Sequence, residues 1–549
     1  MTTHPAEIHL RRPRTARPRL PYRRHAARRR AASGEGMLFS SWAFVVGFLP
    51  VVVLLYRLLP TAWSAQWLVL ASLFYYGWWN PAYLLLILAS TAGNFALGHQ
   101  IAVSSGGVRR LLTAGGVGAN LIVLAYFKYL DFFIETLNDV AGTALSLQHV
   151  TLPLAISFFT FQQIAYLVDV HQGGLRVRSP WEYALFVSFF PQLIAGPIVH
   201  YREMVPQFQA LGRSGANAKN IAIGSAVFAV GLFKKTVIAD GLGAYADPVF
   251  GYADAGHRPS FIESWCGTLA YTFQLYFDFS GYADMAIGAA RMFGIVLPAN
   301  FASPYKSSSI IEFWRRWHMT LSRFLRDYLY IGLGGNRHGR MRRYVNLFTT
   351  MLLGGLWHGA GWNFVMWGGW HGVMLIANHG WRALRGRRQP GATRAMPGTV
   401  GWVLTFAGVT AGWVLFRAET LGGATRMFEA MMLGDGIALP ARWMARLAPL
   451  TTPLQELGLI SSGLSSHGLI HDWYELFALL GVALLTCLAA PNTQQIFARF
   501  SVVLESPPPH RAVRFKLTPT WGVVAGLIAF AALLHLTTRG HVEFIYRFF

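Results

Sequence analysis

The chain has 549 residues, of which 54% are hydrophobic, 14% aromatic and only 13% charged. Soluble domains carry about 25% charged residues, so this composition excludes an ordinary soluble domain and favours a protein built for the lipid bilayer. The formal net charge is +23. In a membrane protein such a bias mainly sets the topology, and no nucleic-acid partner is predicted.

The first 36 residues differ from the rest of the chain. Residues 1–36 hold ten Arg and two Glu and show no amphipathic pattern. We expect a disordered basic tail, or an upstream start codon with translation beginning at Met37; binding to anionic lipid headgroups is the alternative. Residues 37–549 are predicted to form a single membrane domain.

Twelve apolar segments follow, most of them long enough to cross a bilayer core about 30 Å thick. Two are too long for a single crossing: 259–295, in which we expect a break at Gly281, and the glycine-rich 344–380. The sequence therefore predicts an all-α polytopic integral membrane protein with about 11–13 membrane segments. The predicted segments are 38–59, 63–79, 81–103, 111–130, 149–170, 181–200, 218–239, 259–295, 344–380, 398–417, 473–492 and 518–537.

Two connecting segments carry a strong positive charge. Residues 305–343 contain nine Lys or Arg against Glu312 and Asp327, and residues 381–394 contain five Arg and no acid. Such segments are retained on the cytoplasmic side of a membrane. Both flanks of 344–380 are therefore predicted to be cytoplasmic, so this segment crosses twice or forms a re-entrant hairpin.

His358 lies inside this hairpin, in the sequence GGLWHGAGWNF at 354–364. At 1.5 Å per helical residue it lies about 20 Å from the cytoplasmic edge. Non-helical backbone at that depth survives only inside the protein or along a polar cavity, which suggests a tunnel. A neutral imidazole there can take a proton from a hydroxyl and return it. The alternative is a structural histidine at a helix break, and Asn363 is a candidate to orient the ring.

Other polar residues occur in apolar surroundings. The stretch IIEFWRRWHMTLSRFLRDYLYI at 310–331 predicts an amphipathic helix that carries His318 and either lies at the cytoplasmic interface or inserts into the bundle. Asp278 and Asp284 lie in the apolar stretch 274–295, where Arg291 is a candidate partner for Asp284. For these carboxylates a structural polar network is favoured over a catalytic role.

Several kinds of chemistry lack their motifs. The sequence has no P-loop and no G-x-S-x-G nucleophile elbow, which argues against ATP-driven transport and serine-hydrolase chemistry. His358, His371 and His379 are 13 and 8 residues apart, a spacing that gives no helical ligand pair, and no metal site is predicted. The two cysteines, Cys266 and Cys487, follow no metal-ligand pattern.

Together these motifs resemble the membrane-bound O-acyltransferase superfamily, in the branch of the bacterial alginate O-acetyltransferases (the AlgI type). The resemblance covers Met37 to Phe549, and long ordered stretches carry it. They are MLFSSWAF from Met37, SFFTFQQIAYLVDV at 157–170, FFPQLIAGPIVHYREMVPQF at 189–208, QLYFDFSGYADMAIGAARMFGI at 274–295, NFASPYKSSSIIEFWRRWHMTLSRFLRDYLYIGLGGNR at 300–337, GGLWHGAGWNFVMWGGWHG at 354–372 and the chain end EFIYRFF.

The resemblance implies a helical bundle around a central funnel or tunnel that acyl-CoA enters from the cytoplasm. It implies that His358, in the W-H-G motif, is the catalytic base on an acceptor hydroxyl. His318, in the R-R-W-H motif, then lines the cytoplasmic approach to the reacting groups.

The same resemblance suggests roles for further residues. Arg315 and Arg316 are expected near the phosphates of the CoA donor, with Lys306 as a further candidate. Apart from the resemblance, we expect Trp357 as a wall of the tunnel, and from their positions in the sequence we expect Asn363, Asp278 and Asp284 as supporting residues.

In this branch the acetyl group of acetyl-CoA is passed across the bacterial inner membrane to a periplasmic SGNH-type acetyltransferase, which modifies an exported polysaccharide. Acetyl-CoA is a substrate, and no tightly bound cofactor is expected. Two alternatives stay open: a D-alanyl transferase of the same superfamily that serves teichoic acids, and a transporter or lipid flippase without covalent chemistry. An acyl-thioester on Cys266 is a third, minor possibility.

Overall fold

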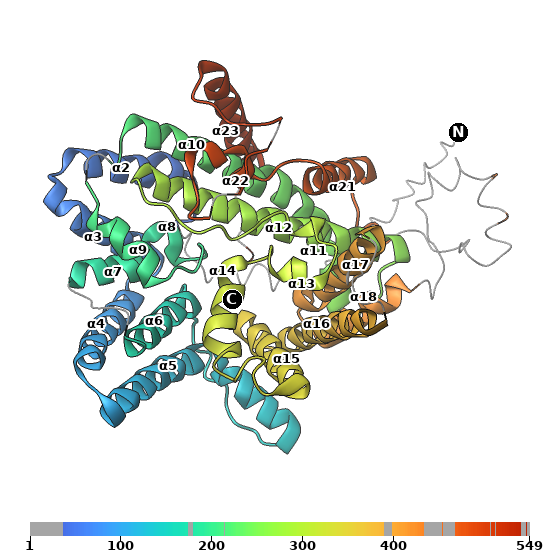
Figure 1. The fold of residues 1–549 in the computed structure, drawn as a ribbon. Helices are drawn as coiled ribbons and strands as arrows, with labels where there is room; N and C mark the ends of the chain where they lie inside the picture. The colour runs from blue at the N-terminus through green and yellow to red at the C-terminus, as the bar shows by residue number, and fades with distance from the viewer. Residues whose placement is uncertain are drawn as a thin grey trace, which may run out of the picture. The chain divides into compact units, whose positions relative to one another are not determined.

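The computed structural model describes residues 37–173, 179–212, 215–388, 398–432, 467–505, 507–510 and 512–539, together with Pro449, Pro453 and Ile545. The basic segment 1–36, part of the loop 381–394 and most of the chain end lie outside the described residues. Within the described part the backbone is helical (Figure 1), and its β-type pairing is one isolated bridge between Leu297 and Val503.

The helices follow the apolar segments of the sequence. Those of the first half are η1 (Ala43–Phe48), α2 (Leu49–Leu58), η2 (Thr61–Trp63), α3 (Ser64–Trp79), α4 (Ala82–Val103), α5 (Gly106–Ala141), α6 (Ile156–His171), α7 (Pro180–Ser188), α8 (Phe190–Leu193), α9 (Tyr201–Gln209), α10 (Ala218–Phe233), η3 (Lys234–Ala239) and α11 (Asp240–Asp254). Those of the second half are α12 (Phe261–Met292), η4 (Pro304–Lys306), α13 (Ile310–Trp314), α14 (Met319–Phe324), η5 (Leu325–Tyr330), α15 (Gly339–His358), α16 (Trp362–Arg388), α17 (Gly398–Arg417), α18 (Leu421–Met431), α21 (Trp473–Leu488), α22 (Thr493–Ile496), η6 (Ala498–Phe500) and α23 (Pro519–Arg539).

Five helical stretches of the described residues are long and apolar enough to cross a membrane. They are Ala82–Val103, Gly106–Ala141, Ala218–Asp254, Gly398–Arg417 and Pro519–Thr538, and two shorter apolar helices are Ala43–Leu58 and Trp473–Leu488. The protein is thus an all-α polytopic membrane protein, as the composition predicts. The total of 11–13 membrane segments stays a prediction.

The central helix α12 corrects one expectation. It runs unbroken from Phe261 to Met292 and packs against α10, α11 and α17 (Figure 1). A Cβ added at Gly281 would lie 2.7 Å from the Gly231 carbonyl oxygen, and one at Gly288 would lie 2.6 Å from that of Gly224. These glycines allow α10 and α12 to approach closely. The predicted break at Gly281 is therefore wrong, because Gly281 serves packing between helices.

The predicted hairpin at 344–380 is confirmed. Helix α15 ends at His358 and α16 begins at Trp362, so the chain turns within three residues. The two helices pack closely along their lengths. A Cβ added at Gly355 would lie only 2.2 Å from the Phe364 carbonyl oxygen, so the glycines permit both the turn and the contact.

The stretch 310–331 is not one helix, in contrast to the prediction. It forms α13, α14 and the π-helical turn η5, and the chain breaks at His318, where φ is +42°. Main-chain bonds from Met319 N to Asn300 O and from Ala302 N to Arg316 O, both 2.9 Å, satisfy the backbone around this break. Of the two predicted placements, insertion into the bundle holds, because its apolar side chains are buried. They include Phe313, Trp317, Leu321 and Phe324.

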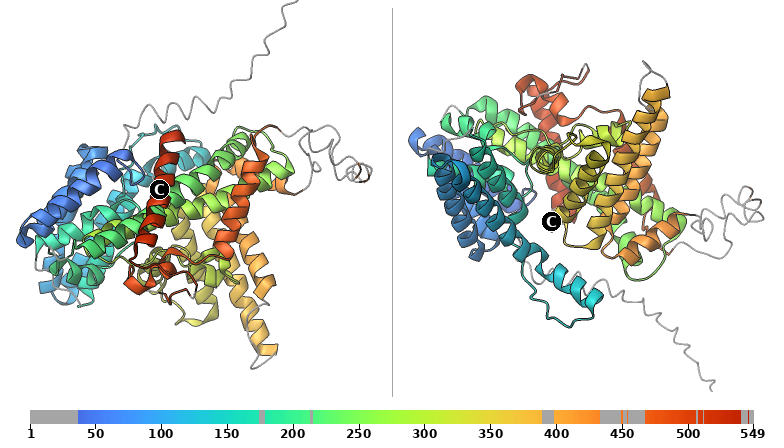
Figure 2. Two further views of the ribbon diagram at one scale, coloured as in Figure 1. Left: turned by 90° about the horizontal axis from the view of Figure 1, so that it is seen from above. Right: turned by 60° about the horizontal axis from the view of Figure 1, so that its bottom comes forward.

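Helix α5 lies beside this core. It packs against α4 and α6 and extends beyond them (Figure 2).

Candidate active site

His318 lies at the break between α13 and α14 and is fully buried. Its Nδ1 lies 3.0 Å from Asn300 Oδ1, which also accepts a hydrogen bond from the Thr320 hydroxyl at 2.9 Å. An amide oxygen only accepts, so Nδ1 carries the proton and Nε2 carries a lone pair. Burial lowers the pKa of His318 to about 3, so the ring is neutral at pH 7. The structure thereby orients a neutral histidine with Nε2 as the acceptor.

His358 lies at the C-terminal end of α15, beside His318. The centroids of the two imidazole rings are 6.3 Å apart, and His358 is 2% exposed. The rings of Trp357 and Trp367 each lie 5.0 Å from that of His358, and Phe416 lies at 5.3 Å. The sequence placed these histidines 40 positions apart; the fold brings them together within one aromatic enclosure. Trp357 is part of its wall.

The end of α15 is held by residues that the sequence analysis did not select. Lys128 of α5 donates from Nζ to the Trp357 carbonyl and, at 3.1 Å, to Ser157 Oγ. The hydroxyl of the neighbouring Tyr129 donates to the Leu356 carbonyl at 2.9 Å. A lysine inside the predicted span 111–130 was a detectable signal, because ionisable residues inside membrane segments are costly and usually functional.

Asn363 does not take the position suggested for it. Its Nδ2 donates to the Ala418 carbonyl at 2.6 Å. This bond ties the first turn of α16 to the end of α17 and so fixes the hairpin that carries His358. Its contribution to the site is structural support of the helices.

The two carboxylates of α12 pair with lysines of the π-helical turn η3. Asp278 Oδ1 lies 2.8 Å from Lys235 Nζ, and its Oδ2 accepts from the Ile545 main-chain N–H at 2.9 Å. Asp284 Oδ2 lies 2.6 Å from Lys234 Nζ. It also accepts a hydrogen bond from Thr493 Oγ1 at 2.6 Å, and Oδ1 accepts one from Gln494 Nε2 at 2.9 Å. Lys234, and not the predicted Arg291, is the cationic partner of Asp284. The favoured hypothesis of a buried structural network fits this geometry.

The three candidate residues for CoA phosphates differ in their surroundings. Arg315 is exposed. Arg316 pairs with Glu312 at 2.7 Å and donates to the Ala302 carbonyl at 3.3 Å. Lys306 donates to the Ala490 carbonyl at 2.9 Å. Of these three side chains, Arg315 is the exposed one.

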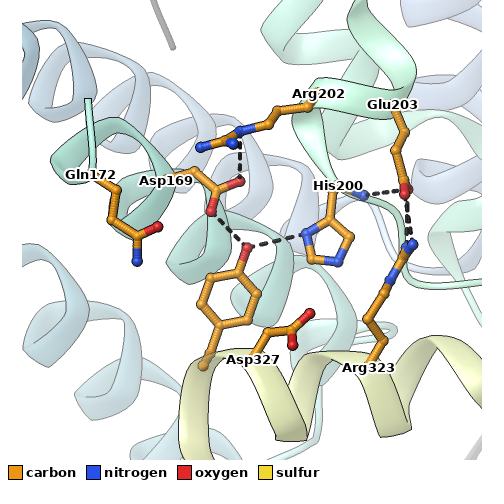
Figure 3. Close-up of a pocket in the computed structure, with 8 residues that line it drawn as sticks. Asp169, Gln172, His200, Arg202, Glu203, Arg323 and Asp327 are labelled. Carbon is orange, nitrogen blue, oxygen red and sulfur yellow. Dashed lines mark hydrogen bonds and ion pairs between the residues drawn. The ribbon is translucent and has the colours of Figure 1, made fainter. Parts of the chain in front are cut away.

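A polar pocket of about 340 Å³ lies where α6, α9, α14 and η5 meet (Figure 3). Its lining residues come from segments far apart in the sequence. They are Asp169, Gln172, His200, Arg202, Glu203, Arg323, Asp327 and Tyr328.

Tyr328 joins two sides of this pocket. Its hydroxyl donates to Asp169 Oδ1 at 2.8 Å and lies 3.1 Å from His200 Nδ1 (Figure 3). Burial and the Asp169 carboxylate raise the pKa of Tyr328 above its usual range, so the phenol stays protonated.

Arg323 on the other side of this pocket makes two hydrogen bonds with Glu203, at 2.6 and 3.0 Å. The Glu203 carboxylate thus balances the charge of Arg323, and the three carboxylates among the lining residues argue against a phosphate site in this pocket.

Comparison with known proteins identifies the chain. The model of the MBOAT, membrane-bound O-acyltransferase family, matches residues 175–417. A peptidoglycan O-acetyltransferase of Helicobacter pylori is 44% identical over 438 residues, which cover 73% of this chain and 81% of the relative. The chain belongs to the membrane-bound O-acyltransferase family. The protein is an O-acyltransferase of the membrane, and the family resemblance predicted from the motifs is confirmed.

Other relatives place this O-acyltransferase within its family. A probable alginate O-acetylase AlgI of Azotobacter vinelandii is 44% identical over 408 residues, or 73% of this chain and 79% of the relative. A teichoic acid D-alanyltransferase of Streptococcus thermophilus is 28% identical over 236 residues, or 42% of this chain and 57% of the relative. His318 and His358 both lie inside the family match, whereas Lys128 lies before it.

Proposed function

We propose that this O-acyltransferase takes an acetyl group from acetyl-CoA on the cytoplasmic side and passes it across the bacterial inner membrane. The group then serves O-acetylation of an exported, alginate-like polysaccharide. The observation that carries the proposal is the buried pair of His318 and His358, whose ring centroids lie 6.3 Å apart where α15 ends. Relatives named as O-acetyltransferase or O-acetylase support acetyl as the transferred group.

In the proposed step His358 is the general base. Its imidazole takes the proton of an acceptor hydroxyl while the oxygen attacks the thioester carbonyl of acetyl-CoA. The new C–O bond forms, the C–S bond breaks, and the CoA thiolate takes the proton back from the imidazolium. His318, with Nδ1 donating to Asn300, directs Nε2 toward the cytoplasmic approach of the donor.

The donor and the partner follow from the same proposal. Arg315 is the first candidate to contact the CoA phosphates, and Arg316 and Lys306 are secondary because protein groups already engage them. A periplasmic SGNH-type acetyltransferase is the proposed recipient of the acetyl group. The relatives named for peptidoglycan and for alginate are equally identical to this chain, at 44%. Sequence identity therefore does not choose between the two glycans, and the acetate of the exported glycan has to be measured.

The two alternatives receive less support. The D-alanyltransferase relative matches less of the chain at lower identity than the O-acetylase relatives. The relatives named as O-acetyltransferase and O-acetylase argue against a transporter without covalent chemistry.

The test is alkali-releasable acetate on the exported glycan of cells that carry His358→Ala. Removal of a general base costs about 10²–10⁴ in rate, so acetate should fall below detection while the protein remains in the membrane. His99→Ala, which changes an exposed histidine of α4, should retain wild-type acetate. Wild-type acetate in His358→Ala would refute the assignment of His358 as the base; labelled D-alanine on the glycan in place of acetate would favour the D-alanyl transferase.

A further inference from the structure

The C-terminal end of α15 needs partners for its last carbonyls, because the last turn of a helix lacks intrahelical donors. The Gly359 N–H bonds to the Gly355 carbonyl at 3.4 Å. Tyr129 caps the next carbonyl, Leu356, and Lys128 caps that of Trp357. The Trp357 carbonyl belongs to the peptide group whose N–H is that of His358. Two adjacent residues of α5 thus hold the backbone that positions the proposed base.

Lys128 differs from Tyr129 in its amino group, which carries a charge when protonated. The lysine is buried, and within the described part of the chain none of the ion pairs includes it. Burying an ammonium without a carboxylate is costly, and Tyr129 shows that a neutral hydroxyl is sufficient to cap a carbonyl of this turn. The negative end of the helix dipole offsets part of the cost. A cap alone therefore does not account for a lysine at this position.

Lys128 also contacts the aromatic wall of the site. Its Nζ lies 5.7 Å from the centroid of the Trp357 indole, within the range of a cation–π contact. That indole lies 5.0 Å from the His358 ring. The ammonium thus engages Trp357 through both its carbonyl and its ring, directly beside His358.

We propose that Lys128 is a positioning residue for acyl transfer. Through its charged hydrogen bond and its contact with the indole, it fixes Trp357 and the end of α15, and thereby the orientation of the His358 imidazole. This inference rests on the proposed function, in which His358 is the base. It predicts that Lys128 serves catalysis more than stability.

The test compares full-length variants in inverted membrane vesicles supplied with labelled acetyl-CoA. Lys128→Met keeps the length of the side chain and removes the charge; kcat should fall about 10²-fold, the effect of a small misplacement of a reacting group, with little change in KM for acetyl-CoA. The melting temperature should change little, because Met removes the cost of burying the amine while it also removes the hydrogen bonds to the Trp357 carbonyl and Ser157. Lys128→Arg, which keeps the charge, should restore part of kcat.

Tyr129→Phe is the matched control, because it removes the neighbouring cap and leaves the ammonium. It should retain most of the wild-type kcat. If Lys128→Met and Tyr129→Phe lower kcat and melting temperature to the same degree, Lys128 is only a helix cap and the inference is overturned.

The reference variant His358→Ala separates the two proposals. If it is inactive while Lys128→Met has wild-type kcat, only the role of Lys128 is refuted. If His358→Ala itself is active, the proposed function fails, whatever the result for Lys128.

Discussion

Gly355→Ala tests the contact that places His358, which lies one helical turn further along α15. A Cβ at this position would lie 2.2 Å from the Phe364 carbonyl oxygen and 3.1 Å from Gly368 Cα and N, all of them backbone atoms. Ordinary van der Waals contact begins at 3.4 Å, so α15 and α16 must separate by about 1 Å to relieve the overlap.

The separation should affect activity more than stability. Overpacking costs about 1–3 kcal/mol, and the better helix propensity of alanine offsets about 1 kcal/mol of it. A displacement of about 1 Å at a reacting group costs about 10²-fold in rate. We therefore expect a small decrease in melting temperature and a loss of kcat of about two orders of magnitude.

The assay is the initial rate of acetyl transfer from labelled acetyl-CoA in inverted vesicles, with melting temperature measured in detergent. Gly369→Ala is the control, because its added Cβ would meet Leu352 Cδ2 at 3.5 Å, an ordinary contact. It should keep the wild-type rate. Wild-type kcat in Gly355→Ala would show that the spacing of α15 and α16 does not position His358.

Two further predictions concern buried charge and protonation. Lys235→Met should destabilise the protein by about 3–5 kcal/mol, because it leaves the buried carboxylates of Asp278 and Asp240 without their cation. The control Lys219→Met changes an exposed lysine and should leave the melting temperature unchanged. Equal changes of melting temperature in the two variants would contradict the buried network. For His318, the folded pKa of about 3 lies below the unfolded value, so the unfolded state binds the extra proton and stability is lost as pH falls from about 6.5 toward 3, by about 1 kcal/mol per pH unit. Relative to His318→Asn, whose asparagine tolerates the positive φ, the wild-type melting temperature should therefore drop between pH 7 and pH 5; a constant difference between the two proteins would show that the ring is not held neutral.

The local properties of the sequence were sufficient for much of the fold. Apolar length predicted a polytopic helical membrane protein, and basic flanks on both sides of 344–380 predicted a hairpin that contains His358. These predictions succeeded because lipid imposes a length and a hydropathy on each segment separately. The motifs around His318 and His358 then indicated the family correctly.

Where a residue's role depends on a distant partner, the sequence was insufficient. In the sequence alone, a glycine that breaks a helix cannot be told from one that lets two helices pack closely. At Gly281 the close approach of α10 shows that the glycine serves packing. The same holds for 310–331, whose apolar spacing is helical although bonds from the segment 300–302 stabilise a break at His318.

The sequence by itself determined that this protein spans the membrane and which family it resembles, and it predicts that His358 lies deep in the bilayer. The tertiary structure decided what holds that histidine: Asn300 orients its neighbour His318, and Lys128, 229 positions before Trp357, fixes the end of its helix. The physical reason is that the hydropathy of a residue depends on that residue and its surrounding solvent alone. A hydrogen bond or a close contact depends on two groups that only the folded chain brings together.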